Sequence, residues 1–186
     1  MIKFNHREKN RGDSMYKIGM VVSYGLEGVC TITQIKQQKF GKSDDPKDFY
    51  VLSPINDPIS KIYVPLDNEI LVFKMRLLCS ADEINALAEA LCDKTMEWIK
   101  ESRQRSHTFR AIISECKIEK LILLIKTISM QEQILFTQGK HLTQGDELVL
   151  KKAQNILIGE FSITTNISNE EILMDVIFCK TKCESK

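Results

Sequence analysis

The sequence predicts an α+β protein in which a small antiparallel β-barrel precedes an all-helical domain of about five helices. Residues 15–76 are rich in Val, Ile, Thr, Tyr and Phe, with the alternation typical of half-buried strands. In residues 77–186 the apolar residues recur instead at helical spacing. The composition, 43% hydrophobic and 27% charged residues over 186 positions, is that of a globular protein with a buried core.

Four or five short strands are expected in the first of these regions. Alternation is clearest at 30–33 and 62–64, and Gly25 and Gly28 bracket a turn. Antiparallel strands of this number and length fit a small barrel. Residues 1–14 are polar and charged, and we expect them to be a disordered extension that precedes the β-domain.

The helices of the second region have recognisable starts. Ser80, followed by acidic residues, is an expected N-cap, and a second helix should run over 95–113. The apolar density of 118–128 predicts a third helix that is buried on more than one side. Thr143–Asp146 resembles a capping box that opens a fourth helix, and a last helix is expected after Ser168.

Charge and hydropathy exclude several classes of protein. The chain has 26 Lys and Arg against 25 Asp and Glu, a net charge of +1, so any contact with a polyanion must rest on a local patch. No apolar run approaches the ~20 residues needed to cross a bilayer, and no secretory signal is evident. A cytoplasmic protein with reduced thiols is therefore expected.

The sequence contains little that indicates catalysis or metal binding. Of six cysteines only Cys179 and Cys183 lie close together, and no second pair has zinc spacing, so neither a metal nor another cofactor is expected. A nucleophile elbow, an HExxH motif and a dinucleotide fingerprint are all missing, which favours a protein that is not an enzyme. An enzyme with Cys116 or Cys30 as nucleophile is a minor alternative.

Two parts of the sequence resemble one family. YKIGMVVSYGLEGVCTITQI, which begins at Tyr16, and the strand 63–65 are similar to the RNA-polymerase-interacting domain of CarD, CdnL and the transcription-repair coupling factor. Trp98, residues 121–128 and HLTQGDELVLKKAQNILIGEFS resemble the helical half of CarD and CdnL, in the same order. The resemblance implies a Tudor- or SH3-like barrel and fits the free-standing CarD/CdnL branch.

This resemblance implies a transcription regulator whose barrel binds the β subunit of bacterial RNA polymerase. The family's polymerase-binding positions correspond to Gln38, Phe40 and Tyr63. CarD has basic residues at the first and third of these positions, so this chain lacks that ion pair. Phe40 is then the expected aromatic anchor, although it could instead cap the barrel.

The helical half of the family contacts promoter DNA at the upstream edge of the melted bubble and stabilises the open complex, without reading base sequence. Trp98, the only tryptophan, corresponds to the family's wedge residue. Core packing beside Arg105 and Phe109 is the alternative. This chain has Glu147–Leu148 where CarD carries a basic pair. The expected phosphate-contacting residues share a positive charge, and they are Lys100, Arg103, Arg105, Lys151 and Lys152.

A second class of function stays open. The near-neutral charge and the interleaved acidic residues also fit an adaptor that binds RNA polymerase or another protein without touching DNA. No membrane or small-molecule partner is expected from either interpretation.

Overall fold

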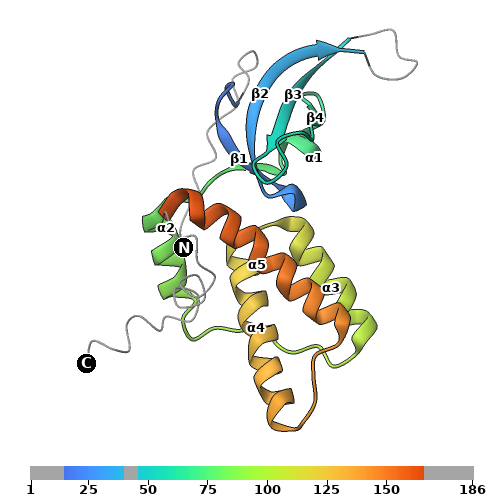
Figure 1. Ribbon diagram of the computed structural model, residues 1–186, viewed down its shortest axis with the longest axis vertical. Helices are drawn as coiled ribbons and strands as arrows, with labels where there is room; N and C mark the ends of the chain where they lie inside the picture. The colour runs from blue at the N-terminus through green and yellow to red at the C-terminus, as the bar shows by residue number, and fades with distance from the viewer. Residues whose placement is uncertain (1–14, 40–45, 166–186) are drawn as a thin grey trace.

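The computed structural model describes residues 15–39 and 46–165, in which an antiparallel sheet is followed by a group of helices (Figure 1). The predicted α+β class is confirmed. The strands are β1 (Val21–Tyr24), β2 (Val29–Gln38), β3 (Lys47–Pro54), β4 (Ile62–Pro65) and β5 (Met75–Leu77). The helices are η1 (Gly25–Glu27), α1 (Glu69–Val72), α2 (Ala81–Ala90), α3 (Ser102–Glu115), α4 (Ile118–Thr137) and α5 (Gln144–Thr165).

The sheet has the order β4-β3-β2-β1-β5, and every neighbouring pair is antiparallel. The turn between β1 and β2 contains η1, flanked by Gly25 with φ of 48° and Gly28 with φ of 72°, a region that glycine enters without strain. Strands β4 and β5 occupy the two edges. Within the described ranges the sheet is therefore open, and the closed barrel expected from the sequence is not shown.

One face of the sheet holds its core. Ile32, Tyr50, Leu52 and Val64 are all almost completely buried on this side. Tyr16, just before β1, closes the cluster: its ring meets that of Tyr50 edge-on at 5.9 Å, and its hydroxyl donates to the Met75 carbonyl oxygen at 2.8 Å. The chain before β1 is thereby attached to β5.

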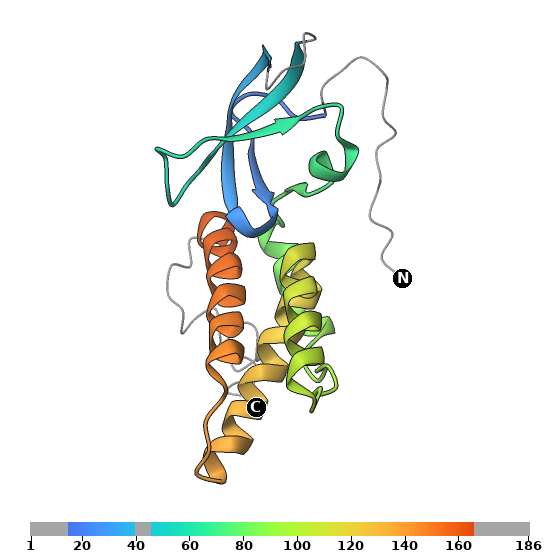
Figure 2. The same ribbon diagram turned by 90° about the vertical axis from the view of Figure 1, so that its right-hand side faces the viewer.

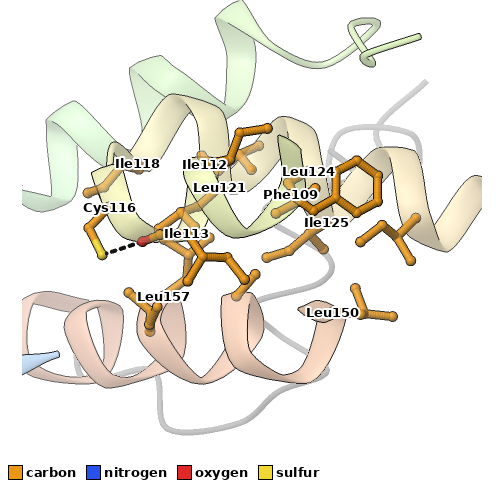
Figure 3. Close-up of a cluster of buried hydrophobic side chains, with 14 of the residues drawn as sticks. Phe109, Ile112, Ile113, Cys116, Ile118, Leu121, Leu124, Ile125, Leu150 and Leu157 are labelled. Atoms are coloured by element: carbon orange, nitrogen blue, oxygen red, sulfur yellow. Dashed lines mark hydrogen bonds between the residues drawn. The ribbon is translucent and has the colours of Figure 1, made fainter. Parts of the chain in front are cut away.

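Helices α3, α4 and α5 surround a second core (Figure 3). The dense apolar run of α4 is buried on more than one side, as its sequence predicted. In Figure 3, Leu150 and Leu157 of α5 face the side chains of α3 and α4. The long-range packing of these helices, rather than intrinsic propensity, accounts for most of their stability.

Two predicted helix starts are confirmed by their caps. The Ser80 hydroxyl accepts from the Glu83 amide at 3.3 Å, and the Glu83 carboxylate accepts from the Ser80 amide at 2.9 Å, which makes a full capping box. At the start of α5, the Thr143 hydroxyl accepts from the Asp146 amide at 3.2 Å. Both caps satisfy amides that the first helical turn leaves without partners.

One expected helix start was wrong. The sequence placed the second helix over 95–113, but α3 begins at Ser102. Glu101 is the N-cap, because its carboxylate accepts from the amides of Arg103 and Gln104. Residues 91–101, which we name the connector, leave α2 and reach α3 without regular helix between Met96 and Lys100.

The sheet and the helices meet at the C-terminal end of α5, which lies against the sheet (Figure 2). Arg76 of β5 forms two hydrogen bonds, each of 2.6 Å, with the carboxylate of Glu160, and its Nε donates to the Cys116 carbonyl oxygen at 3.3 Å. The Cys79 amide also donates to Glu160, at 3.0 Å. Glu160 is completely buried, so this cluster joins the sheet to two helices.

Two expectations fall on residues that the structure does not describe: the extension 1–14 and the helix after Ser168. Among the described helices, none combines the length and apolar character that a membrane span requires.

Candidate functional site

The first candidate surface is the face of the sheet that lies opposite its core. Alternate residues of a strand share a face, and the register puts Lys36 of β2 opposite Phe49 of β3. The Tyr63 ring of β4 meets the Phe49 ring edge-on at 6.4 Å, and the Lys36 ammonium lies 5.1 Å from the Tyr63 ring centroid. We call these three residues the Tyr63 face.

Lys36 was not among the residues singled out from the sequence. Its position was available, because it lies two residues before Gln38 and therefore on the same face of β2. CarD has basic residues at the positions of Gln38 and Tyr63, which this chain lacks. The Lys36 ammonium beside Tyr63 supplies a positive charge to the same surface.

Of the two other predicted residues on this side, only Gln38 is described. It ends β2 opposite Lys47, and its Oε1 atom is buried without a hydrogen-bond partner in the part of the chain that the structure describes. Phe40, the expected aromatic anchor, lies outside the described residues, so its role stays a prediction.

The second candidate surface is centred on Trp98, which is carried by the connector rather than by a helix. The indole is partly buried and packs against the helical core. Its ring meets Phe109 of α3 at 6.0 Å with an interplanar angle of 62°, and the guanidinium carbon of Arg105 lies 4.5 Å from its centroid. The expected contacts with Arg105 and Phe109 thus exist, although they do not arise from one shared helix.

Arg105 requires a correction. It was expected to contact DNA phosphates, but its side chain is only 6% exposed, and its Nε and Nη2 donate to the two oxygens of Asp146 at 2.9 and 2.8 Å. Its Nη1 donates to the carbonyl oxygens of Ile99 and Lys100 at 2.9 and 3.2 Å. The guanidinium is therefore committed to the protein interior, where a buried cation needs such partners.

Two further buried polar residues hold the connector, and the sequence indicated neither of them. Lys126 of α4 donates to the carbonyl oxygens of Leu91 and Cys92, next to the C-terminal end of α2. Thr127 accepts from the Met96 amide at 2.8 Å. These side chains replace the backbone hydrogen bonds that a helix would have supplied to the connector.

The other predicted phosphate contacts are exposed. Lys100 lies in the connector just before α3, and Arg103 lies in the first turn of that helix. Arg103, His107 and Arg110 follow one another at helical spacing along one face of α3. All three line a shallow hollow beside α3. This face of α3 therefore brings His107 and Arg110 beside Arg103.

Lys151 and Lys152 are also exposed, on α5. They follow Asp146 by roughly one and a half helical turns, and Asp146 points inward to Arg105. This pair lies on a different element from Lys100, which is in the connector, and from Arg103, which is on α3. Whether it contacts DNA stays a prediction.

The thiols suggested as nucleophiles lie in environments that disfavour the thiolate. Burial raises the pKa of Cys30 and of Cys116 to about 11. Both side chains are buried, and the Cys116 thiol donates to the Ile113 carbonyl oxygen at 2.8 Å (Figure 3). A nucleophilic cysteine needs a lowered pKa and access to substrate. Among the described residues, no cluster of three or more Cys, His, Asp and Glu could hold a metal ion.

Comparison with known proteins identifies the N-terminal region. Residues 16–84 match the family model of the CarD-like/TRCF RID domain, a range that covers the whole sheet and the start of α2. A search of curated proteins found no relative of the chain.

Proposed function

We infer that residues 16–84, which match the family model of the CarD-like/TRCF RID domain, are an RNA-polymerase-interacting module. We propose that the chain is a bacterial transcription regulator that binds the β subunit of RNA polymerase through this domain. The helical domain then stabilises the open promoter complex by contacting DNA at the upstream fork. The match to the RID family is the observation that carries the proposal. In this role the protein is not an enzyme, and it acts in the cytoplasm, beside the polymerase.

The Tyr63 face supports the polymerase contact. Tyrosine is one of the residue types that are enriched among those that dominate the free energy of an interface, and Tyr63 is partly exposed whereas Phe49 behind it is buried. Tyr63 also lies on β4, an edge strand of the sheet, where an added strand of a partner can pair with the backbone. The polymerase would thus contact both the backbone of the edge strand β4 and the ring of Tyr63.

Binding of purified bacterial RNA polymerase tests this part. We expect Tyr63→Ala and Lys36→Ala each to weaken binding by about fivefold or more, which corresponds to ~1 kcal/mol. Lys140→Ala, which removes an exposed lysine beyond the end of α4, is the matched control and should bind as wild type. Equal binding by all four proteins would refute the assignment of this face.

The surroundings of Trp98 support the DNA contact. The indole is partly exposed at the end of the connector, and Lys100 and Arg103 follow it at the start of α3. An aromatic side chain that meets a partly unstacked base step offsets some of the cost of unstacking, and nearby cations fix its position by binding phosphates. Because polymerase tethers the protein at the promoter, a weak DNA contact is sufficient.

The lifetime of the open complex tests this second part. We expect Trp98→Ala to bind polymerase as wild type but to shorten the lifetime, because the wedge binds the open state better than the closed state. Arg103→Ala should shorten it less and should reduce the salt dependence by roughly one phosphate contact. An unchanged lifetime in Trp98→Ala would exclude the wedge.

An adaptor that contacts no DNA is the second candidate function. The observation that favours it is the burial of Arg105, which removes one cation from the expected DNA-binding set. Binding of forked DNA by the full chain separates the two candidates. Salt-dependent binding would contradict the adaptor, and a lack of binding both in isolation and in the polymerase complex would favour it.

A further inference from the structure

Trp98 has no helix of its own to orient it. It lies in the part of the connector, 96–100, where the backbone has no regular structure. Extended segments of this kind open more easily than packed helices, because few of their own backbone groups are bonded to one another. Any function that depends on the direction of the indole therefore needs a second group to set it.

Arg105 makes contacts that can serve this purpose. Its guanidinium carbon lies 4.5 Å from the centroid of the Trp98 ring, within the range of a cation–π interaction. Its Nη1 donates to the carbonyl oxygens of Ile99 and Lys100, the two residues that directly follow Trp98. One side chain thus contacts both the ring and the backbone next to it.

Asp146 in turn determines where the guanidinium lies. Its two carboxylate oxygens accept from Nε and Nη2 at 2.9 and 2.8 Å, a two-point contact that fixes the plane of the arginine as well as its position. The Thr143 hydroxyl donates to Asp146 at 2.7 Å, so the carboxylate is itself held by the N-terminal cap of α5. The chain of contacts runs from α5 through Arg105 to Trp98.

We propose that Arg105, held by Asp146, is a positioning residue that sets the orientation and exposure of Trp98. This inference rests on the proposed function for its biological consequence, since Trp98 is the proposed wedge. A lysine could not replace Arg105, because a single ammonium cannot bond both carboxylate oxygens in one plane, reach two backbone carbonyl oxygens and cover the indole.

Intrinsic fluorescence measures this positioning directly, since Trp98 is the only tryptophan in the chain. The variants are Arg105→Met, which keeps an unbranched side chain but removes every donor, and Arg105→Lys, which keeps the charge. We expect both to shift the emission maximum of the free protein to the red and to increase quenching by acrylamide. A shifted spectrum in Arg105→Lys would show that the indole needs the geometry of the guanidinium, because this variant keeps the positive charge.

Two controls separate positioning from a general loss of stability. Ile118→Val removes one buried methyl group from the helical core and should leave the emission maximum unchanged while it lowers the free energy of unfolding. Asp146→Asn leaves Arg105 and Trp98 in place but removes the charge that holds the Arg105 guanidinium, and it should shift the spectrum in the same direction. This second route also tests the proposal if Arg105→Met fails to fold. A wild-type spectrum and wild-type quenching in folded Asp146→Asn and Arg105→Lys would overturn the inference.

The functional consequence is measured in the polymerase complex. We expect Arg105→Lys to bind polymerase as wild type and to shorten the open-complex lifetime toward that of Trp98→Ala. If the spectrum shifts but Trp98→Ala itself leaves the lifetime unchanged, positioning stands and the proposed wedge is wrong. If Trp98→Ala shortens the lifetime and Arg105→Lys does not, the orientation set by Arg105 has no role in the wedge.

Discussion

Three of the described thiols are buried or partly buried, and burial determines their reactivity. The pKa of Cys30, Cys79 and Cys116 is raised from 9.0 to about 11, in each case first by burial. For Cys79 the carboxylate of Glu160 adds to the effect, since its negative charge disfavours a second one nearby. At neutral pH these thiols are therefore protonated and poor nucleophiles.

Alkylation of the native protein tests this statement. Iodoacetamide at neutral pH should modify these three thiols slowly, and urea should make all of them react quickly, because unfolding removes the burial that raises the pKa. Peptide-level mass spectrometry identifies each site. Fast modification of native Cys116 or Cys30 would revive the interpretation of the chain as a cysteine-dependent enzyme.

The same shifts determine a dependence of stability on pH. A thiol whose pKa is higher in the folded state binds its proton more tightly there, so its contribution to stability is complete below pH 9. That contribution is lost as the pH rises from about 9 toward 11.

At the level of the element, the starts of α2 and α5 were predictable, because each cap depends on residues three positions apart. Ser80 and Glu83 form such a reciprocal pair at the start of α2. The start of α3 was predicted wrongly because its cap residue is not one of the usual types. Its cap is Glu101, a residue type less usual at this position than Ser, Thr, Asp or Asn.

Ser80→Ala measures the contribution of the α2 cap. We expect the free energy of unfolding to fall by about 1 kcal/mol, since the Glu83 amide loses its acceptor. Urea unfolding followed by circular dichroism gives the value. Ser114→Ala, at an exposed position near the end of α3, is the control and should cost nothing measurable. Equal effects of the two substitutions would contradict the role of the cap.

At the level of the whole molecule, the cluster of Arg76, Glu160 and Cys79 couples the sheet to the helical domain. Glu160 has no exposure to solvent, and both of its oxygens accept from Arg76. Loss of one partner of a buried ion pair leaves the other charge without compensation and typically costs ~3–5 kcal/mol. The relative orientation of the two candidate surfaces depends on this joint.

We therefore expect Glu160→Gln to unfold in two steps in urea where the wild type unfolds in one, since the sheet and the helices would lose a buried ion pair that joins them. Hydrogen exchange resolved by segment should show increased exchange first in β5 and at the end of α5. Lys120→Gln breaks the exposed pair of Lys120 with Glu115 and is the control, for which no second transition is expected. A single transition in Glu160→Gln with wild-type exchange at β5 would show that the domains are held together elsewhere.

Much of this architecture follows from short-range patterns in the chain. Alternation identified the strand region, helical spacing identified the apolar face of α4, and the residues around Ser80 and Thr143 marked helix starts. The resemblance of the first region to the RNA-polymerase-interacting domain was confirmed by the match over residues 16–84. Each of these signals lies within a few neighbouring residues, or within one continuous segment, so no knowledge of the fold was needed.

The roles of individual charged residues depended instead on partners that are distant in the chain. Arg105 and Asp146 are 41 positions apart, Lys126 and Leu91 are 35 apart, and Arg76 and Glu160 are 84 apart. In the sequence each of these cations is indistinguishable from a solvated surface residue, because its charge is known but its neighbours are not. Folding brings the partners together and compensates each charge as it is buried, which is why Arg105 became a support for Trp98 rather than a contact with DNA.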